Sequence, residues 1–88
     1  MAVTVKVQGR VQGVGYRMSC ATEAIRLGGF GWVRNEPDES VSGHFEGTPT
    51  AVDALVAWCR QGPRFSRVRS VTTMPASPYA ATRFEVRY

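Results

Sequence analysis

The order in which apolar patterns follow one another limits this chain to very few folds. Residues 2–8 alternate apolar and polar side chains, which is typical of a strand with one buried face. Residues 16–27 change to helical spacing, and Gly28-Gly29 ends this helix because glycine is favoured just past a helix end. The stripe expected to face the core consists of Met18, Ala21 and Ile25.

The remaining elements are separated by residues that favour turns or helix ends. Residues 30–36 and 41–46 are predicted strands around the turn at 37–40, and therefore form a hairpin. Thr48-Pro49 is typical of the start of a second helix, and Gly62-Pro63 of its end. The predicted buried stripe of this helix is Val52, Leu55, Val56 and Cys59. A fourth strand is expected at 67–74, then a loop at 75–81 and a last strand marked by Phe84, Val86 and Tyr88.

This order of strand, helix, strand, strand, helix and strand predicts the ferredoxin-like β-α-β-β-α-β class of α+β fold. Right-handed crossovers would place both helices on one face of an antiparallel sheet. We expect the whole chain, residues 1–88, to be a single domain.

The composition and net charge of the chain limit its location and the ligands that it can bind. Hydrophobic residues make up 43% and charged residues 20%, which fits an ordinary soluble protein. No apolar run approaches the ~20 residues that span a bilayer, and the N-terminus does not read as a signal peptide, so a cytoplasmic protein is expected. The net charge of +4 favours anionic ligands, either phosphates or nucleic acid. Four arginines near the end of the second helix are interpreted as a solvated edge, with guidance of an anionic substrate or an acidic partner as the alternative: Arg60, Arg64, Arg67 and Arg69.

The glycine-rich segment at residues 9–17 carries the clearest chemistry. Gly13 and Gly15 permit positive φ, so the main-chain N–H groups of Gly13, Val14, Gly15, Tyr16 and Arg17 can turn inward around an anion. The start of the following helix adds unpaired N–H groups, and the planar fork of Arg17 can hold two phosphate oxygens. A dinucleotide fingerprint would need glycine where Met18 stands, and a nucleotide P-loop would need a lysine. A plain glycine-rich turn beside a surface arginine is the structural alternative.

A second informative residue is Asn35, near the end of the second predicted strand. Its amide can both donate and accept hydrogen bonds, so it can orient a water molecule. The structural alternative is an asparagine that begins the turn before Glu36-Pro37-Asp38.

These two segments closely resemble the signature segments of the acylphosphatase family. The family pattern Gly-x-Val-Gln-Gly-Val-x-Phe-Arg falls on residues 9–17, with Tyr16 in place of phenylalanine. The pattern Gly-aromatic-Val-basic-Asn falls on residues 31–35, followed by Val41 and Gly47 at the family spacing. The ending at 84–88 is also similar. One departure is Glu39, where the family has a glycine, and a glutamate at positive φ would strain the hairpin turn by about 1 kcal/mol or more.

The resemblance implies hydrolysis of the carboxyl-phosphate bond of acyl phosphates by direct water attack, with Arg17 and Asn35 as the catalytic residues. It implies a small-molecule substrate, no cofactor and no metal. Because nothing extends beyond the terminal strands, we expect an independent enzyme. We also expect it to be a monomer. The alternative from another class is a non-catalytic phosphate- or carbamoyl-phosphate-binding module of the same fold.

A nucleic-acid binder of this fold class would present exposed aromatic residues on its first and third strands. Those strands are instead expected to carry Lys6, Gln8, Ser42 and His44 outward, so nucleic acid is not an expected partner. A membrane is not expected either, because no apolar run is long enough to span one. His44 is predicted to have no catalytic role. Cys20 is expected to be a buried or half-buried helix thiol and Cys59 a core residue, with no disulfide in the cytosol.

Overall fold

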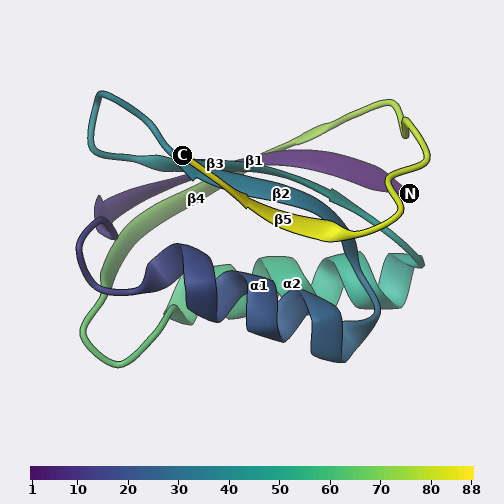
Figure 1. The fold of residues 1–88 in the computed structure, drawn as a ribbon. Coiled ribbons are helices and arrows are strands. Elements are labelled where there is room, and N and C mark those ends of the chain that lie inside the picture. Colours follow the sequence, from purple (N-terminus) through teal and green to yellow (C-terminus); the bar gives the residue numbers. More distant parts are fainter.

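The chain folds as two helices packed on one face of a five-stranded sheet, as described for residues 1–88 by a computed structural model (Figure 1). The elements are, in order, β1 (Ala2–Arg10), α1 (Tyr16–Leu27), β2 (Phe30–Asn35), β3 (Val41–Glu46), α2 (Pro49–Gln61), β4 (Arg67–Pro75) and β5 (Phe84–Arg87). The predicted ferredoxin-like α+β fold is confirmed, and each boundary lies close to its predicted position.

The sheet has the strand order β4-β1-β3-β2-β5. The first four strands are antiparallel to their neighbours, but β5 pairs in parallel with β2, so the sheet is mixed and the expectation of a wholly antiparallel sheet was wrong at this edge. After β4 the chain crosses the sheet through residues 76–83 and enters β5 from the end where β1 and β2 also begin (Figure 1). That entry point forces β5 to run parallel to β2.

The core lies between the sheet and the two helices. Three residues of the predicted α2 stripe, Val52, Leu55 and Cys59, are fully buried, and Val56 is partly buried. The predicted cap of α2 is also present, because the Thr48 hydroxyl accepts a hydrogen bond from the Ala51 N–H at 3.1 Å. A threonine at this position satisfies an N–H group that the helix itself leaves unpaired.

The predicted buried stripe of α1 was wrong. Met18 and Ile25 are 61% and 68% exposed, and of the three residues only Ala21 is buried. The buried face instead consists of Tyr16, Cys20, Ala21 and Ala24. These residues recur at helical spacing too, and their mostly small side chains let α1 pack against α2 as well as the sheet.

His44 corrects a second expectation. It lies on the face of the sheet opposite the helices, as predicted, but it is buried together with Glu46. Both lie beneath the loop that precedes β5, since the His44 ring is 4.7 Å from the Tyr79 ring and the Glu46 carboxylate accepts hydrogen bonds from the N–H groups of Tyr79 and Ala81.

Neither helix is long and apolar enough to cross a membrane.

Candidate active site

At one end of the sheet, the termini of all five strands come together around the predicted site. β1, β2 and β5 run in the same direction and end there at Arg10, Asn35 and Arg87. β3 and β4 run the other way and begin there at Val41 and Arg67. The loop of residues 11–15 leaves β1 at this end of the sheet and enters α1, which packs beneath β2 and β5.

The loop has the conformation that the sequence predicts. Gly13 and Gly15 have φ of 74° and 75°, in the left-handed region that favours glycine. A Cβ atom at either position would meet no atom within 4 Å, so space does not require glycine there. The backbone conformation alone does.

The main-chain donors of this loop are unused. No N–H group from Gln12 to Met18 donates to a main-chain carbonyl in a turn, loop or cap. The first turn of a helix has no acceptors of its own for these groups, and Gly15 supplies no side-chain cap. The first turn of α1 also contains no acidic residue, so the positive end of the helix dipole is not neutralised there.

Arg17 lies in that first turn and is half-buried. Its Nη1 atom donates to the Arg87 carbonyl at 2.9 Å, and its guanidinium carbon lies 4.6 Å from the centre of the Tyr88 ring. One of the five guanidinium donors is therefore used to hold the side chain against the C-terminus, and no carboxylate is paired with the others. Sequence reasoning missed these two C-terminal partners.

Asn35 is the last residue of β2, and its side chain lies on the same face as the buried Val33, toward the helices. Its Oδ1 atom is buried and accepts no hydrogen bond from the protein. Leaving such an acceptor unpaired costs about 1–3 kcal/mol, so a buried acceptor of this kind is expected to bind a donor from water or a ligand.

Gln12 is a further site residue that sequence reasoning missed. Its Nε2 atom donates to the carbonyls of Glu36 at 2.8 Å and Ser40 at 2.9 Å. These two bonds tie the glycine loop to the β2–β3 turn, immediately after Asn35. Gln12 is part of the matched motif, which was the only sequence signal for it.

Tyr16 is accommodated in place of the family phenylalanine. Its hydroxyl donates to the Cys59 carbonyl at 2.8 Å, and its ring packs 5.4 Å from the Trp58 ring. Burial raises the pKa of Tyr16 well above its ordinary value, so the hydroxyl stays neutral and keeps this bond. Cys59 and Cys20 are both buried free thiols, and the interaction with Cys59, together with burial, raises the pKa of Cys20.

Glu39, which stands where the family has a glycine, adopts the strained conformation. Glu39 has φ of 72°, which a non-glycine residue adopts only at a cost in free energy. Its N–H donates to the Glu36 carbonyl at 3.1 Å, so the turn closes in spite of the strain.

No group of three or more His, Cys, Asp or Glu side chains is placed to hold a metal ion.

Comparison with known proteins gives one consistent result. The model of the acylphosphatase family matches residues 3–86. The chain is 50% identical to an acylphosphatase from a Nocardioides species, over 98% of this chain and 87% of that protein. It is 53% identical to an acylphosphatase from Rubrobacter xylanophilus, over 97% of this chain and 78% of that protein. The crystal structure of acylphosphatase from Bacillus subtilis superimposes with a TM-score of 0.95 at 33% identity, covering 99% of this chain and 98% of that one.

Proposed function

The chain belongs to the acylphosphatase family, and we propose that residues 13–17 form its phosphate site, with Arg17 and Asn35 as the catalytic residues. Acylphosphatases hydrolyse the carboxyl-phosphate bond of acyl phosphates to a carboxylate and inorganic phosphate. The observation that carries the proposal is a set of unpaired main-chain donors at the same end of the sheet as the unpaired Oδ1 of Asn35.

The first requirement of this reaction is to neutralise the negative charge on the phosphate oxygens. Each equatorial oxygen of the transferring group can accept hydrogen bonds from the amides of residues 13–17 and from the free edge of the Arg17 guanidinium. The Arg87 carbonyl and the Tyr88 ring hold that guanidinium in place before substrate binds, so little reorganisation is needed.

Alignment of the attacking water is the second requirement. The Oδ1 atom of Asn35 can accept a proton of the water in a hydrogen bond and so aim an oxygen lone pair at phosphorus. Gln12 keeps the phosphate loop and the end of β2 in register, because its amide bridges them.

The chemistry needs few other groups. The leaving carboxylate has a conjugate acid of pKa about 4–5, so it departs as a stable anion without a general acid. A loose phosphoryl transition state also makes a strong base less important. Positioning and charge neutralisation can then supply the rate enhancement.

The test is hydrolysis of benzoyl phosphate with EDTA present, which also measures any need for a metal. Arg17→Ala is expected to lower kcat/KM by about 10³-fold or more, and Arg17→Lys to remain poor because a point charge cannot replace a two-pronged grip. Asn35→Ala is expected to lower kcat by roughly 10²-fold while phosphate still binds. Arg26→Ala, an exposed arginine on the same helix, is the matched control with parent-like activity.

Two outcomes would contradict the assigned roles. A parent protein without benzoyl phosphatase activity would reject the function itself. An Asn35→Ala protein that loses phosphate binding but keeps its kcat would show that Asn35 holds phosphate and does not place water.

We also propose a monomeric, cytoplasmic enzyme with no nucleic-acid partner. Two free thiols suit a reducing compartment. On the face opposite the helices, β1 and β3 present Thr4, Lys6 and Ser42 and no exposed aromatic residue. The comparisons favour the hydrolase over the binding module, since the matching family relatives are themselves acylphosphatases over nearly the whole chain.

A further inference from the structure

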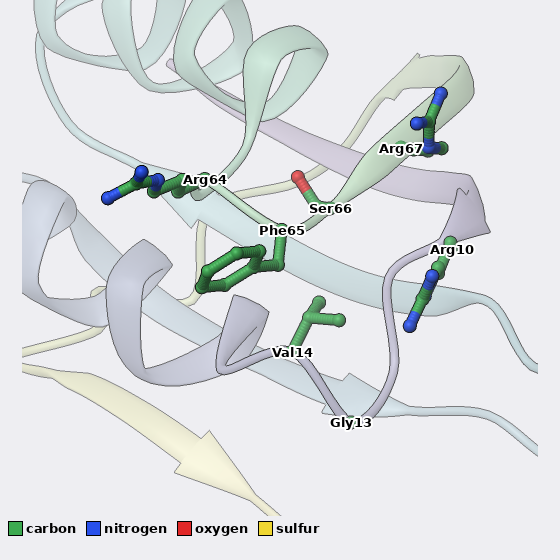
Figure 2. A pocket seen from close by; sticks show the side chains of 7 residues that line it. All are labelled: Arg10, Gly13, Val14, Arg64, Phe65, Ser66 and Arg67. Carbon is green, nitrogen blue, oxygen red and sulfur yellow. The ribbon is translucent and has the colours of Figure 1, made fainter.

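An open cavity of about 700 Å³ lies beside the phosphate loop, and the roles assigned above to Arg17 and Asn35 do not involve it (Figure 2). The residues that line it are Arg10, Gly13, Val14, Arg64, Phe65, Ser66 and Arg67. They come from the end of β1 and the loop that follows it, and from the connection between α2 and β4 with the first residue of β4. The cavity shares Gly13 and Val14 with the proposed phosphate site, so the two sites have a common wall.

The charge around this cavity is positive and uncompensated. Arg10, Arg64 and Arg67 are all exposed, and none of them takes part in the ion pairs of the protein. No acidic residue lines the cavity. In Figure 2 the guanidinium groups of Arg10 and Arg67 lie on one side of the labelled residues, and that of Arg64 lies on the opposite side, beyond the Phe65 ring.

Two of the residues that line the cavity, Val14 and Phe65, are apolar. The Phe65 ring is directed toward Val14 and is 71% exposed, although such a large apolar ring is usually buried (Figure 2). The Arg64 guanidinium lies 5.6 Å from the centre of this ring. The Ser66 hydroxyl donates to the Pro63 carbonyl at 2.7 Å and fixes the turn that carries Phe65. Two apolar side chains beside three arginines suit an organic group that ends in an anion.

The position of the cavity matches the direction in which the leaving group must depart. In an in-line displacement the attacking water and the leaving oxygen lie on opposite sides of phosphorus. Asn35 is at the end of β2, whereas the cavity lies at the β4 side of β1, and β3 separates β1 from β2 in the sheet. With water held by Asn35, the acyl group therefore points across the Gly13-Val14 wall toward the arginines.

We propose that this cavity binds the acyl portion of the substrate, and that its arginines select acyl phosphates carrying a second anionic group, a carboxylate or a phosphate. The proposal rests on the proposed function, because it assumes that the phosphate occupies residues 13–17. Phe65 and Val14 contact the carbon skeleton, and Arg10, Arg64 and Arg67 bind the distal anion.

The experiment compares kcat/KM for three substrates of similar shape: benzoyl phosphate, 4-carboxybenzoyl phosphate and 4-phosphonobenzoyl phosphate. At low ionic strength the parent is expected to prefer at least one anionic substrate over benzoyl phosphate by about fivefold or more. Which of the two is preferred distinguishes a carboxylate from a phosphate as the second anion. Arg10→Gln, Arg64→Gln and Arg67→Gln are each expected to reduce this preference by about two- to fivefold, because kcat/KM falls more for the anionic substrate than for benzoyl phosphate.

Arg69→Gln is the matched control, because it removes the same charge from an exposed position of β4 outside the cavity. Its substrate preference should equal that of the parent. A parent that hydrolyses all three substrates equally well would overturn the proposal, as would an Arg69→Gln protein whose preference falls as much as that of the cavity variants. A parent that hydrolyses none of them would instead reject the proposed function, so the two failures are distinguishable.

Discussion

Gln12→Met tests whether the phosphate loop and the β2–β3 turn act as one unit. Methionine keeps the length and approximate volume of glutamine but removes the amide that donates to the carbonyls of Glu36 and Ser40. We expect both the stability and the activity of the protein to fall, because the same two bonds support the fold and align the proposed site.

The size of the stability loss follows from the bonding of the two carbonyls. Two hydrogen bonds at 2.8 and 2.9 Å contribute about 1–3 kcal/mol in total. Each carbonyl keeps a second donor after the substitution, since the Glu39 N–H binds the Glu36 carbonyl and the Glu36 N–H binds the Ser40 carbonyl. No acceptor is orphaned, so we expect a loss of about 1–2 kcal/mol, which lowers the Tm by roughly 5–15 °C in a domain of this size.

The activity loss follows from misalignment. A shift of about 1 Å between phosphate and water can cost up to about 100-fold in rate, and we expect a fall of roughly tenfold in kcat for benzoyl phosphate. Thermal unfolding followed by circular dichroism gives the Tm, and kinetics at 25 °C, well below the transition, give kcat. Gln8→Met is the matched control, because Gln8 accepts one hydrogen bond from Ser70 at 3.1 Å on β1, away from the site.

Two results would refute this reasoning. A Gln12→Met protein with the Tm of the parent would mean that the two bonds contribute nothing net to the fold. A lower Tm with an unchanged kcat, or an equal loss of activity in Gln8→Met, would mean that the link between loop and turn does not align the site.

Two further predictions concern strain and charge. Glu39→Gly should relieve the positive-φ strain and stabilise the protein by about 0.5–1 kcal/mol in urea unfolding, whereas Glu39→Ala should not, because the Cβ atom remains. Burial alone would raise the pKa of Glu46, but the hydrogen bonds from His44, Ala81 and Tyr79 outweigh it and hold that pKa below its ordinary value. The resulting stability is present above the unfolded pKa of about 4.3 and is lost as the pH falls through the lower folded value, so Glu46→Gln should be less stable than the parent at pH 7 and the difference should shrink at pH 3. If the parent exceeded Glu46→Gln in stability as much at pH 3 as at pH 7, the stabilisation would not come from the ionised Glu46 carboxylate.

Local patterns in the sequence predicted most of the secondary structure. Alternation in β1, the glycines after each helix and the Thr48-Pro49 start of α2 all depend on residues within one or two turns of one another. Such short-range constraints act before the chain is folded. For the same reason, the positive φ of the glycine loop could be predicted from its composition.

Long-range partners could not be predicted in this way. Arg17 is held by Arg87, far along the chain, and the amide of Gln12 reaches across to the β2–β3 turn. The pattern of β5 shows that it is a strand, but no residue in it specifies that β2 is its neighbour or that the pairing is parallel. His44 was placed on the correct face, and only the path of the loop over it decided that it is buried.

The sequence by itself determined the order of the elements, the glycine loop and the residue types at the candidate site. The tertiary structure decided which face of α1 is buried, since two apolar stripes competed and the one with Cys20 and the alanines is buried, while Met18 and Ile25 remain exposed. It also decided that Arg64 and Arg67 line the same cavity as Gly13. The physical reason is that backbone conformation is set within a few residues, whereas contacts between distant segments depend on how the whole chain packs.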